Sequence, residues 1–324
     1  MRAAGPPSPD LLVRARSAAE PALRAMLAAH PATAMLASVP LLPVLGGLSN
    51  LCWRAAAGGR SHFIRLAPQA TEDLGADHGN ECRVLDVACA AGLAPRIVRC
   101  DTESRLLVTE WIDGAEEGSP LPRTQAFTTA ARALAKLHDI PVPPDLRIVD
   151  FTRQARELRA ALPPLSRYQG LDDVAMVVLG TLQDGTARQV LCHHDLNPLN
   201  LLFDRGGRLW LVDWEYAGLG DPVFDLASYA SQHGLGTRQL ARFAAAYAGA
   251  GGRAVDAGRL RQATWAFDYV QWLWYRAAVQ GHDTLADREL AQARTERLAA
   301  SLRGRARRVL RCNNEPFADN ETRV

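Results

Sequence analysis

The run from His193 to Asn200 reads His-His-Asp-Leu-Asn-Pro-Leu-Asn and contains groups whose spacing could do chemistry. It places a carboxylate at Asp195 and an amide five residues later at Asn200, and Asp213 follows thirteen residues after Asn200. Phosphoryl transfer needs a carboxylate that orients and deprotonates the attacking hydroxyl, and oxygen ligands that hold Mg²⁺ against the phosphates. We expect Asp195 to act as the base and Asn200 and Asp213 to bind the metal.

Each of these residues also has a structural interpretation. Asp195 could simply form a turn, and Asn200 and Asp213 could be a loop cap and a strand-end residue. We expect His193 to be structural, tying the loop backbone together, and therefore not to be the general base. His194 is expected to be a loop residue in contact with solvent.

Local patterns supply the elements that would position these groups. Val190–Cys192 and Arg208–Val212 are short apolar runs typical of strands. Gly206-Gly207 predicts the turn of a two-stranded hairpin that would bring Asn200 and Asp213 together. The polar loop after Cys192 would then carry the candidate base.

The N-terminal third has a different texture. Residues 51–57 and 61–66 predict two strands joined at Gly58-Gly59, and residues 97–100 and 106–111 predict a second strand pair. Helices are predicted at 11–29, 80–91, 122–138 and in two further stretches before residue 190, and the chain is expected to be helical from residue 221 to about residue 308.

Composition excludes several classes of protein. The chain has 324 residues and a formal net charge of +2, which gives no strong field for a nucleic acid or a membrane surface. Lys136 is the single lysine among 37 basic residues and follows no glycine-rich loop, which excludes a Walker A motif. A Schiff base could form only at Lys136, which argues against pyridoxal or aldolase chemistry. Any phosphate-binding cation must therefore be an arginine, and Lys136 is expected on a helix surface.

The six cysteines are at positions 52, 82, 89, 100, 192 and 312 and include no Cys-x-x-Cys pair. We expect them to be reduced and mostly buried rather than part of a disulfide or zinc framework. The N-terminus leads into no uninterrupted apolar segment, and no stretch reaches the ~20 apolar residues of a spanning helix. A cytoplasmic location is therefore expected.

Several motifs resemble the aminoglycoside phosphotransferase and choline kinase superfamily, which is related to protein kinases. The resemblance covers about residues 40–282 and rests on a phosphate-loop-like run at 45–50, a strand at 64–66, a helical Glu81, a hinge-like run at 106–114, the His193–Asn200 loop, and Asp213-Trp214-Glu215-Tyr216-Ala217-Gly218 with Asp221 and Asp225. It implies an α+β, bilobal protein-kinase-like fold with a small β-rich N-lobe and a larger, mostly helical C-lobe. Residues 11–112 and 113–310 would form the two lobes, between a disordered tail at 1–10 and a tail at 311–324.

The resemblance also assigns roles to residues. It implies that ATP is bound by Gly46, Gly47, Ser49, Asn50, Arg65, Glu81, Glu110 and Ile112, with Mg²⁺ as cofactor. It implies that Asn197, Glu215, Trp272 and Tyr275 contact the acceptor, and that His193 and Asp225 support the site from the loop and the following helix. Gly46-Gly47 could instead be a plain hairpin turn.

Arg65 departs from the lysine that many members of this superfamily carry at the same place. The choline-kinase branch accepts arginine there, and a guanidinium can bind two phosphate oxygens at once. We therefore interpret Arg65 and Glu81 as an active ion pair.

An aromatic series follows at Trp265, Tyr269, Trp272, Trp274 and Tyr275. Trp265 and Tyr269 are expected in the core, since they share one helix face with Trp272. Trp272 and Tyr275 are the better candidates for an acceptor pocket, where aromatic faces could hold a cation at about 0.5–2 kcal/mol each.

The sequence therefore predicts an ATP- and Mg²⁺-dependent kinase acting on the hydroxyl of a small cationic alcohol of the choline, ethanolamine or thiamine type. Two alternatives stay open: a kinase for another hydroxylated metabolite or an aminoglycoside, and a non-catalytic nucleotide-binding pseudokinase. Neither a nucleic-acid nor a membrane partner is expected, and the arginines between 303 and 311 are interpreted as a solvated helix end. The sequence leaves the oligomeric state open.

Overall fold

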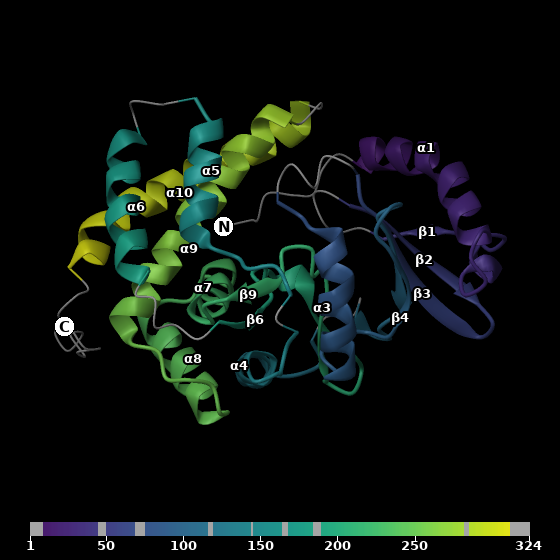
Figure 1. Ribbon diagram of the computed structural model, residues 1–324, viewed down its shortest axis with the longest axis horizontal. Helices are drawn as coiled ribbons and strands as arrows, with labels where there is room; N and C mark the ends of the chain where they lie inside the picture. Colours follow the sequence, from purple (N-terminus) through teal and green to yellow (C-terminus); the bar gives the residue numbers. More distant parts are fainter. Residues whose placement is uncertain are drawn as a thin grey trace. The chain divides into compact units, whose positions relative to one another are not determined.

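The computed structural model describes residues 9–44, 50–68, 75–115, 119–143, 145–163, 168–183, 189–281 and 285–311 (Figure 1). The chain divides into two compact units. The first comprises Met1–Pro122, Leu199–Tyr216 and His282–Leu290, and the second comprises Arg123–Pro198, Ala217–Gly281 and Ala291–Val324. The first unit thus takes in residues 199–216, which the sequence analysis places in the C-terminal lobe. Among the described residues, no helix combines the length and apolar character that a bilayer crossing requires.

An antiparallel five-stranded sheet forms the centre of the first unit, in the order β1-β2-β3-β5-β4. Its strands are β1 (Leu42–Pro43), β2 (Leu51–Ala57), β3 (Arg60–Leu66), β4 (Ile97–Asp101) and β5 (Leu106–Glu110). The predicted hairpin between β2 and β3 is confirmed, and Gly58 and Gly59 both have positive φ, at 59° and 75°. Both glycines suit the tight turn that the twist of the paired strands favours.

The two faces of this sheet have different roles. Helix α1 (Pro9–Ala28) and the short helix η1 (Ala34–Leu36) cover one face, where Leu23 and Leu27 pack with Trp53 and Ile64. Because side chains alternate along a strand, Arg65 of β3 points to the opposite face. Helix α3 (His78–Ala90) packs against β4, and its N-cap is the side chain of Asp77.

A second predicted hairpin is also confirmed in the first unit. Strands β7 (Leu201–Phe203) and β8 (Leu209–Leu211) pair in antiparallel register after the one-turn helix η4 (Pro198–Asn200). Beyond the paired strands, the backbone N–H of Val212 donates to the carbonyl of Asn200 at 3.1 Å. The hairpin therefore sets Asn200 beside the residue that precedes Asp213.

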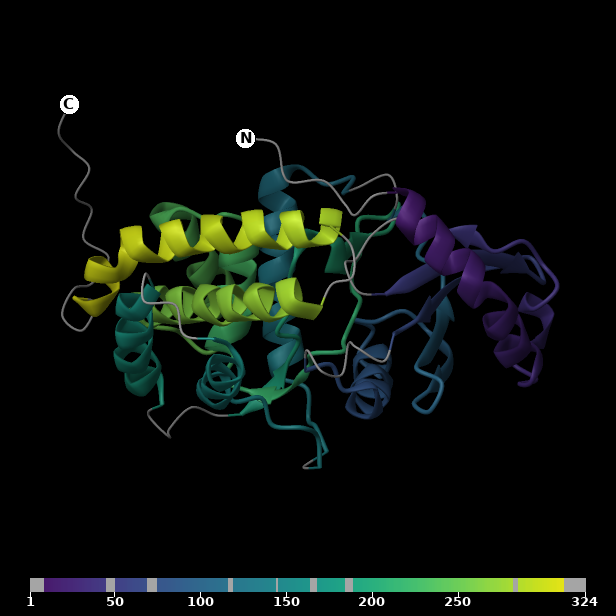
Figure 2. The ribbon, with the colours of Figure 1, turned by 90° about the horizontal axis from the view of Figure 1, so that it is seen from above.

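The second unit is built mostly from helices, which are α4 (Arg123–His138), α5 (Phe151–Ala161), α6 (Gln169–Leu182), α7 (Val223–Gln232), α8 (Thr237–Gly249), α9 (Ala257–Gly281) and most of α10 (Leu285–Leu310). Helix α9 is central, since α5, α6 and α7 all pack against it. Figure 2 shows α9 and α10 side by side, and Trp265 of α9 donates to the carbonyl of Leu302 of α10. Lys136 is exposed on α4, as expected.

A short strand pair completes the second unit. Strands β6 (Val190–Cys192) and β9 (Gly218–Gly220) are antiparallel, so the predicted strand at 190–192 is confirmed. The loop from His193 to Pro198 leaves β6, and β9 leads towards α7. The candidate base at Asp195 therefore follows a buried strand directly.

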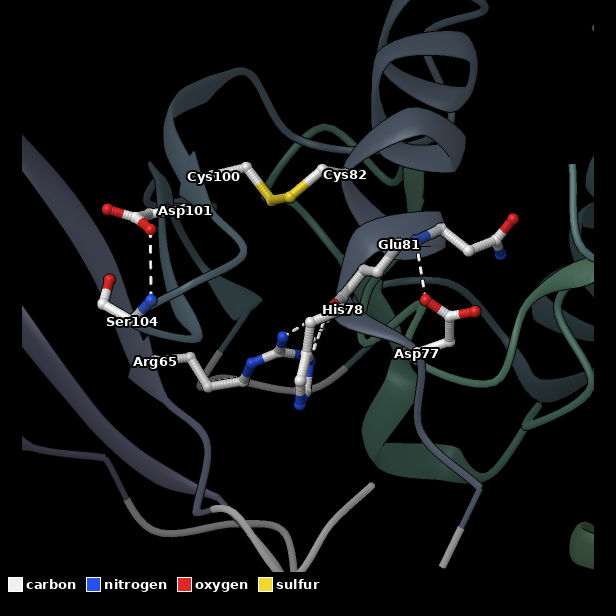
Figure 3. The surroundings of a disulfide bond; sticks show 9 residues. Arg65, Asp77, His78, Glu81, Cys82, Cys100, Asp101 and Ser104 are labelled. Atoms are coloured by element: carbon white, nitrogen blue, oxygen red, sulfur yellow. Dashed lines mark hydrogen bonds and ion pairs between the residues drawn. A yellow bond between two sulfur atoms is a disulfide. The ribbon is translucent and has the colours of Figure 1, made fainter. Parts of the chain in front are cut away.

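The expectation that all cysteines are reduced is wrong for one pair. Cys82 of α3 and Cys100 of β4 form a disulfide, with their Cα atoms 5.7 Å apart (Figure 3). The two residues are 18 positions apart and belong to no local motif, so only the packing of α3 on β4 brings them together. The expected free thiols are confirmed at Cys52, Cys89 and Cys192, whereas Cys312 lies outside the described residues.

This disulfide should stabilise the chain measurably. Replacing Cys82 and Cys100 together by Ser should lower the free energy of unfolding by about 3 kcal/mol, because closing a loop of this size restricts the unfolded chain. Urea denaturation with and without a dithiol reductant measures the effect.

In the same experiment, Cys89→Ser on the same helix is the matched control and should leave the unfolding free energy within about 0.5 kcal/mol of the original chain. The reductant should destabilise the original chain and leave the double variant unchanged. Equal stability of the original chain in both conditions would contradict the prediction.

Candidate active site

Arg65 is the centre of a buried charge cluster in the first unit. One guanidinium nitrogen donates to Glu81 Oε1 at 2.8 Å and to Asp213 Oδ1 at 2.8 Å, and the other bonds Glu81 Oε2. Glu215 Oε2 lies 3.8 Å from the same guanidinium and accepts from Asn50 Nδ2 at 3.2 Å. The predicted Arg65–Glu81 pair is therefore formed, and it gathers two further acids (Figure 3 shows the pair).

Three carboxylates around one guanidinium leave an excess of negative charge. Burial opposes the charge on Glu81, but Arg65 and the His78 side chain hold the pKa of Glu81 below its usual value. Glu215 receives less compensation: burial, and then the nearby Asp213, raise its pKa to about 8. The cluster thus has a deficit of positive charge that a cation could fill.

The oxygen donors fit Mg²⁺ in chemical type. Asp213 offers a carboxylate and Asn200 an amide oxygen, and hard cations such as Mg²⁺ prefer oxygen ligands. Asp213 has a φ of 65°, a strained backbone conformation of the kind that occurs at functional sites. In addition, Asn50 Oδ1 is buried and has no hydrogen-bond partner among the described residues. An orphaned acceptor and an excess of acid together favour a cation at this place.

The nucleotide residues are described only in part. Gly46, Gly47 and Ser49 lie outside the described residues. At the predicted hinge, the Glu110 side chain is engaged by Arg60 at 3.2 Å and Arg96 at 2.7 Å. Its backbone N–H is bonded to the carbonyl of Arg96, whereas the N–H of Ile112 has no partner in the described part of the chain.

The loop carrying Asp195 is held within the second unit by the first turn of α7. Asp225 accepts from the backbone N–H of His193 at 2.9 Å and of His194 at 2.7 Å, while the His193 ring accepts from the N–H of Asp195 at 3.3 Å. Asp225 also bonds the His138 ring at 3.1 Å, and that ring meets Tyr247 Oη at 2.8 Å. This geometry agrees with supporting roles for His193 and Asp225.

The Asp225 carboxylate is strongly stabilised in its ionised form. Burial alone would raise its pKa, but hydrogen bonds from His138 and the loop, together with the charge of His194, lower the pKa to about 2. An ionised acceptor bonds backbone N–H groups more strongly than a neutral one. Asp225 therefore fixes the loop at all physiological pH values.

His194 is not exposed to solvent as expected, because its ring is buried beside Phe151, with ring centroids 5.3 Å apart. Gly220 permits this position, since a Cβ there would come within 2.9 Å of the His194 ring. Neither ring nitrogen has a hydrogen-bond partner among the described residues. Burial consequently lowers the pKa of His194 to about 4.

The expected acceptor residues are divided between the two units. Asn197 Nδ2 donates to Asp195 Oδ2 at 2.9 Å, and Glu215 belongs to the Arg65 cluster. Trp272 is fully buried against Tyr168 and Tyr269, which favours a core role for it as for Trp265 and Tyr269. Tyr275 is partly exposed, and its hydroxyl accepts a hydrogen bond from Arg294 at 2.7 Å. Burial raises the pKa of Tyr275, Arg294 opposes this rise, and the negative charge of Asp195 adds to it.

Residues missed by sequence reasoning support both groups. His78 bonds Glu81 at 3.3 Å, and His138 and Tyr247 extend the Asp225 network. Gln232 donates from Nε2 to Asp195 Oδ1 at 2.9 Å. No motif marks these residues; only their tertiary position does.

A cavity of about 280 Å³ in the second unit borders His138 and Tyr247 but contains none of the predicted catalytic, metal or substrate residues. Its charged lining includes Arg259 and Asp221, which are already paired with each other at 2.5 Å. We therefore do not assign the reaction to this cavity.

The buried His194 should make stability depend on pH. Its pKa of about 4 in the fold lies below the ordinary value of 6.5, so the unfolded chain binds more protons between these values. The stability of the original chain should therefore fall as the pH drops from 6.5 towards 4. His194→Leu removes this titration. The melting temperature of the variant minus that of the original chain should therefore increase as the pH is lowered from 6.5 towards 4. A difference that stays constant with pH would contradict burial of a neutral ring.

Parts of this chain are similar in sequence to known proteins. Protein LicA of Haemophilus influenzae is 54% identical over 37 residues, which are 11% of this chain and 14% of LicA. Ethanolamine kinase 2 of Mus musculus is 26% identical over 181 residues, which are 52% of this chain and 46% of that protein. The matches thus span less than half the length of these curated relatives.

A solved structure matches over more of the chain. The choline/ethanolamine kinase family protein from Mesorhizobium loti is 26% identical and superposes with a TM-score of 0.71, covering 90% of this chain and 98% of that one. The expected α+β, kinase-like fold class is thereby confirmed. The model of the Phosphotransferase enzyme family matches residues 40–263. Since this match spans more than half of the sequence, the chain belongs to the phosphotransferase enzyme family.

Proposed function

We propose that this chain transfers the γ-phosphate of ATP to the hydroxyl of a small cationic alcohol of the choline, ethanolamine or thiamine type. The observation that carries the proposal is the Arg65 cluster, in which Glu81 and Asp213 both bond one buried guanidinium. Phosphate oxygens can replace a carboxylate on a guanidinium, so a buried arginine held by acids can serve as a phosphate-binding group.

In this proposal Asp195 orients and deprotonates the acceptor hydroxyl. Asp195 and Asn200 are five residues apart, so the chain between them spans at most about 18 Å. The Asp225 network fixes the loop backbone, and Asn197 bonds the Asp195 carboxylate. These contacts restrict the base to few conformations, which is what a positioned proton acceptor requires.

Asn200 and Asp213 would hold Mg²⁺, which neutralises charge on the phosphates when bound. Arg65, positioned by Glu81, would bind phosphate oxygens, and the backbone of residues 46–50 would contribute N–H donors. The N–H of Ile112 and the carbonyl of Glu110 would receive the adenine. Because the reaction consumes ATP, we also propose a cytoplasmic location for it.

A second candidate is a kinase for another hydroxylated metabolite. Two observations favour it over a quaternary ammonium acceptor: Trp272 is fully buried, and Arg294 places a positive charge on the hydroxyl of Tyr275. A cationic acceptor would meet no exposed face of Trp272 and would be repelled by Arg294 if it bound at Tyr275.

The proposed function is tested by ADP release from ATP and Mg²⁺ over a panel of choline, ethanolamine, thiamine, aminoglycosides and sugars. We expect stimulation by at least one cationic alcohol and loss of the signal when Mg²⁺ is chelated. Asp195→Asn should lower kcat by about 10²-fold or more, because the variant keeps the shape and loses the proton acceptor.

The outcomes of this panel separate the candidates. Stimulation by a sugar or an aminoglycoside alone would support the second candidate. ATP binding without stimulation by any acceptor would indicate a non-catalytic nucleotide-binding protein. Full activity of Asp195→Asn would contradict the assignment of the base.

The phosphate-binding role of Arg65 gives a separate prediction. Arg65→Ala should raise the KM for ATP or lower kcat by at least about tenfold, since it removes the guanidinium that would bind phosphate and that the three acids surround. The matched control is Arg132→Ala, an exposed arginine of α4 that should change neither constant. Steady-state kinetics at varied ATP measure both variants, and unchanged kinetics in Arg65→Ala would contradict the role.

A further inference from the structure

We propose that Gln232 is a positioning residue that fixes the orientation of the Asp195 carboxylate. Its side-chain nitrogen Nε2 donates to Asp195 Oδ1 at 2.9 Å. The inference rests on the proposed function, in which Asp195 is the proton acceptor, and it adds a residue that neither the sequence motifs nor the family match assigns. The amide can act only as a donor here, because an ionised carboxylate has no proton to give.

Gln232 lies on the face of α7 that holds the whole loop. Asp225, Ser228 and Gln232 are at positions i, i+3 and i+7 of the helix and therefore share one face. Asp225 binds the backbone N–H groups of His193 and His194, and the Ser228 hydroxyl accepts from the N–H of Leu196 at 2.9 Å. These contacts fix the backbone on both sides of Asp195 but do not bond its carboxylate.

The side-chain torsions are fixed by two amides, one on each carboxylate oxygen. Asn197 reaches Oδ2 from within the same loop, so it moves wherever the loop moves. Gln232 reaches Oδ1 from the last turn of a helix whose other residues are packed in the second unit. The Gln232 contact therefore holds the carboxylate from a helix outside the loop.

Amides suit this task because they are neutral. An arginine or lysine in place of Gln232 would hold the carboxylate as an ion pair and stabilise its charged form, weakening it as a proton acceptor. A carboxylate offers about four lone-pair directions, and two amide bonds occupy only two of them. The two amides therefore do not by themselves fill the acceptor positions of the carboxylate.

The Gln232 side chain is half-buried, and among the residues that the structure describes its hydrogen-bonding partner is Asp195. Losing the amide should therefore affect the carboxylate more than the stability of the fold. Gln154 on α5 is a matched glutamine, also half-buried in the second unit, with no side-chain hydrogen bond to another described residue.

The test compares Gln232→Met with Gln154→Met, since methionine keeps the length and loses the amide. With choline as acceptor and MgATP, Gln232→Met should lower kcat about tenfold or more through misplacement of the base, with the KM for ATP and the melting temperature unchanged. Gln154→Met should leave all three values as in the original chain. An unchanged kcat in Gln232→Met, or a loss matched by a fall in melting temperature, would overturn the inference.

Gln232→Glu should change the kcat–pH profile, which a purely structural role of Gln232 would not affect. It places a second carboxylate beside Asp195, which disfavours the ionised base, so the acidic limb of the kcat–pH profile should move to higher pH. The other titratable groups at the loop, among the described residues, are His193, His194, Asp225, His233 and Tyr275, and all of them are common to every variant compared. A profile identical to that of the original chain would overturn the inference.

The failure of the proposed function is distinguishable from the failure of this inference. If no cationic alcohol of the panel stimulates ADP release by the original chain, the proposed function fails, and the crystal structure of Gln232→Met then decides the positioning role. A rotated Asp195 carboxylate in that structure supports the role. A carboxylate that stays in place overturns it.

Discussion

The buried guanidinium of Arg65 is the interaction on which the first unit depends. Taking an arginine out of water is costly unless its charge is matched, and here Glu81 and Asp213 bond it directly. Burial opposes the charged form, yet the surrounding acids raise the pKa of Arg65 well above its usual value. Burial, and then the nearby Asp213, raise the pKa of Glu215 to about 8. The ion pairs hold the cluster together, but its three carboxylates outnumber the single guanidinium.

An analogous principle operates in the second unit, where α7 organises the loop of Asp195. The ionised Asp225 at the start of the helix and Ser228 one turn later bind the loop backbone, and Gln232 at its end binds the side chain. Residues of one helix therefore bond both the loop backbone and the Asp195 carboxylate. If separate elements held the loop, each of them could move relative to the others and shift the loop with it.

Local structure could be predicted from the sequence because it leaves short-range signals, and the candidate reactive groups could be proposed on the same kind of signal. Gly58-Gly59 between alternating strands predicts a hairpin, and the spacing of Asp195, Asn200 and Asp213 is readable without any contact being known. The Cys82–Cys100 bond and the Gln232 contact leave no such signal, because each joins elements that only tertiary packing brings together. The burial of Trp272 is hidden for a related reason: helical spacing shows which side chains share a face, not how deeply that face is covered.

The disulfide and the ion pair constrain the same geometry from two sides. Cys82 follows Glu81 directly in α3, and its bond to Cys100 attaches the helix to β4, which pairs with β5. Arg65 lies on β3, which pairs with the other edge of β5. Helix and guanidinium are therefore tied to one hydrogen-bonded sheet, so the ion pair need not hold α3 in place alone. A buried pair stabilises a fold only when its surroundings maintain its geometry, and the covalent attachment of α3 provides that condition for Glu81.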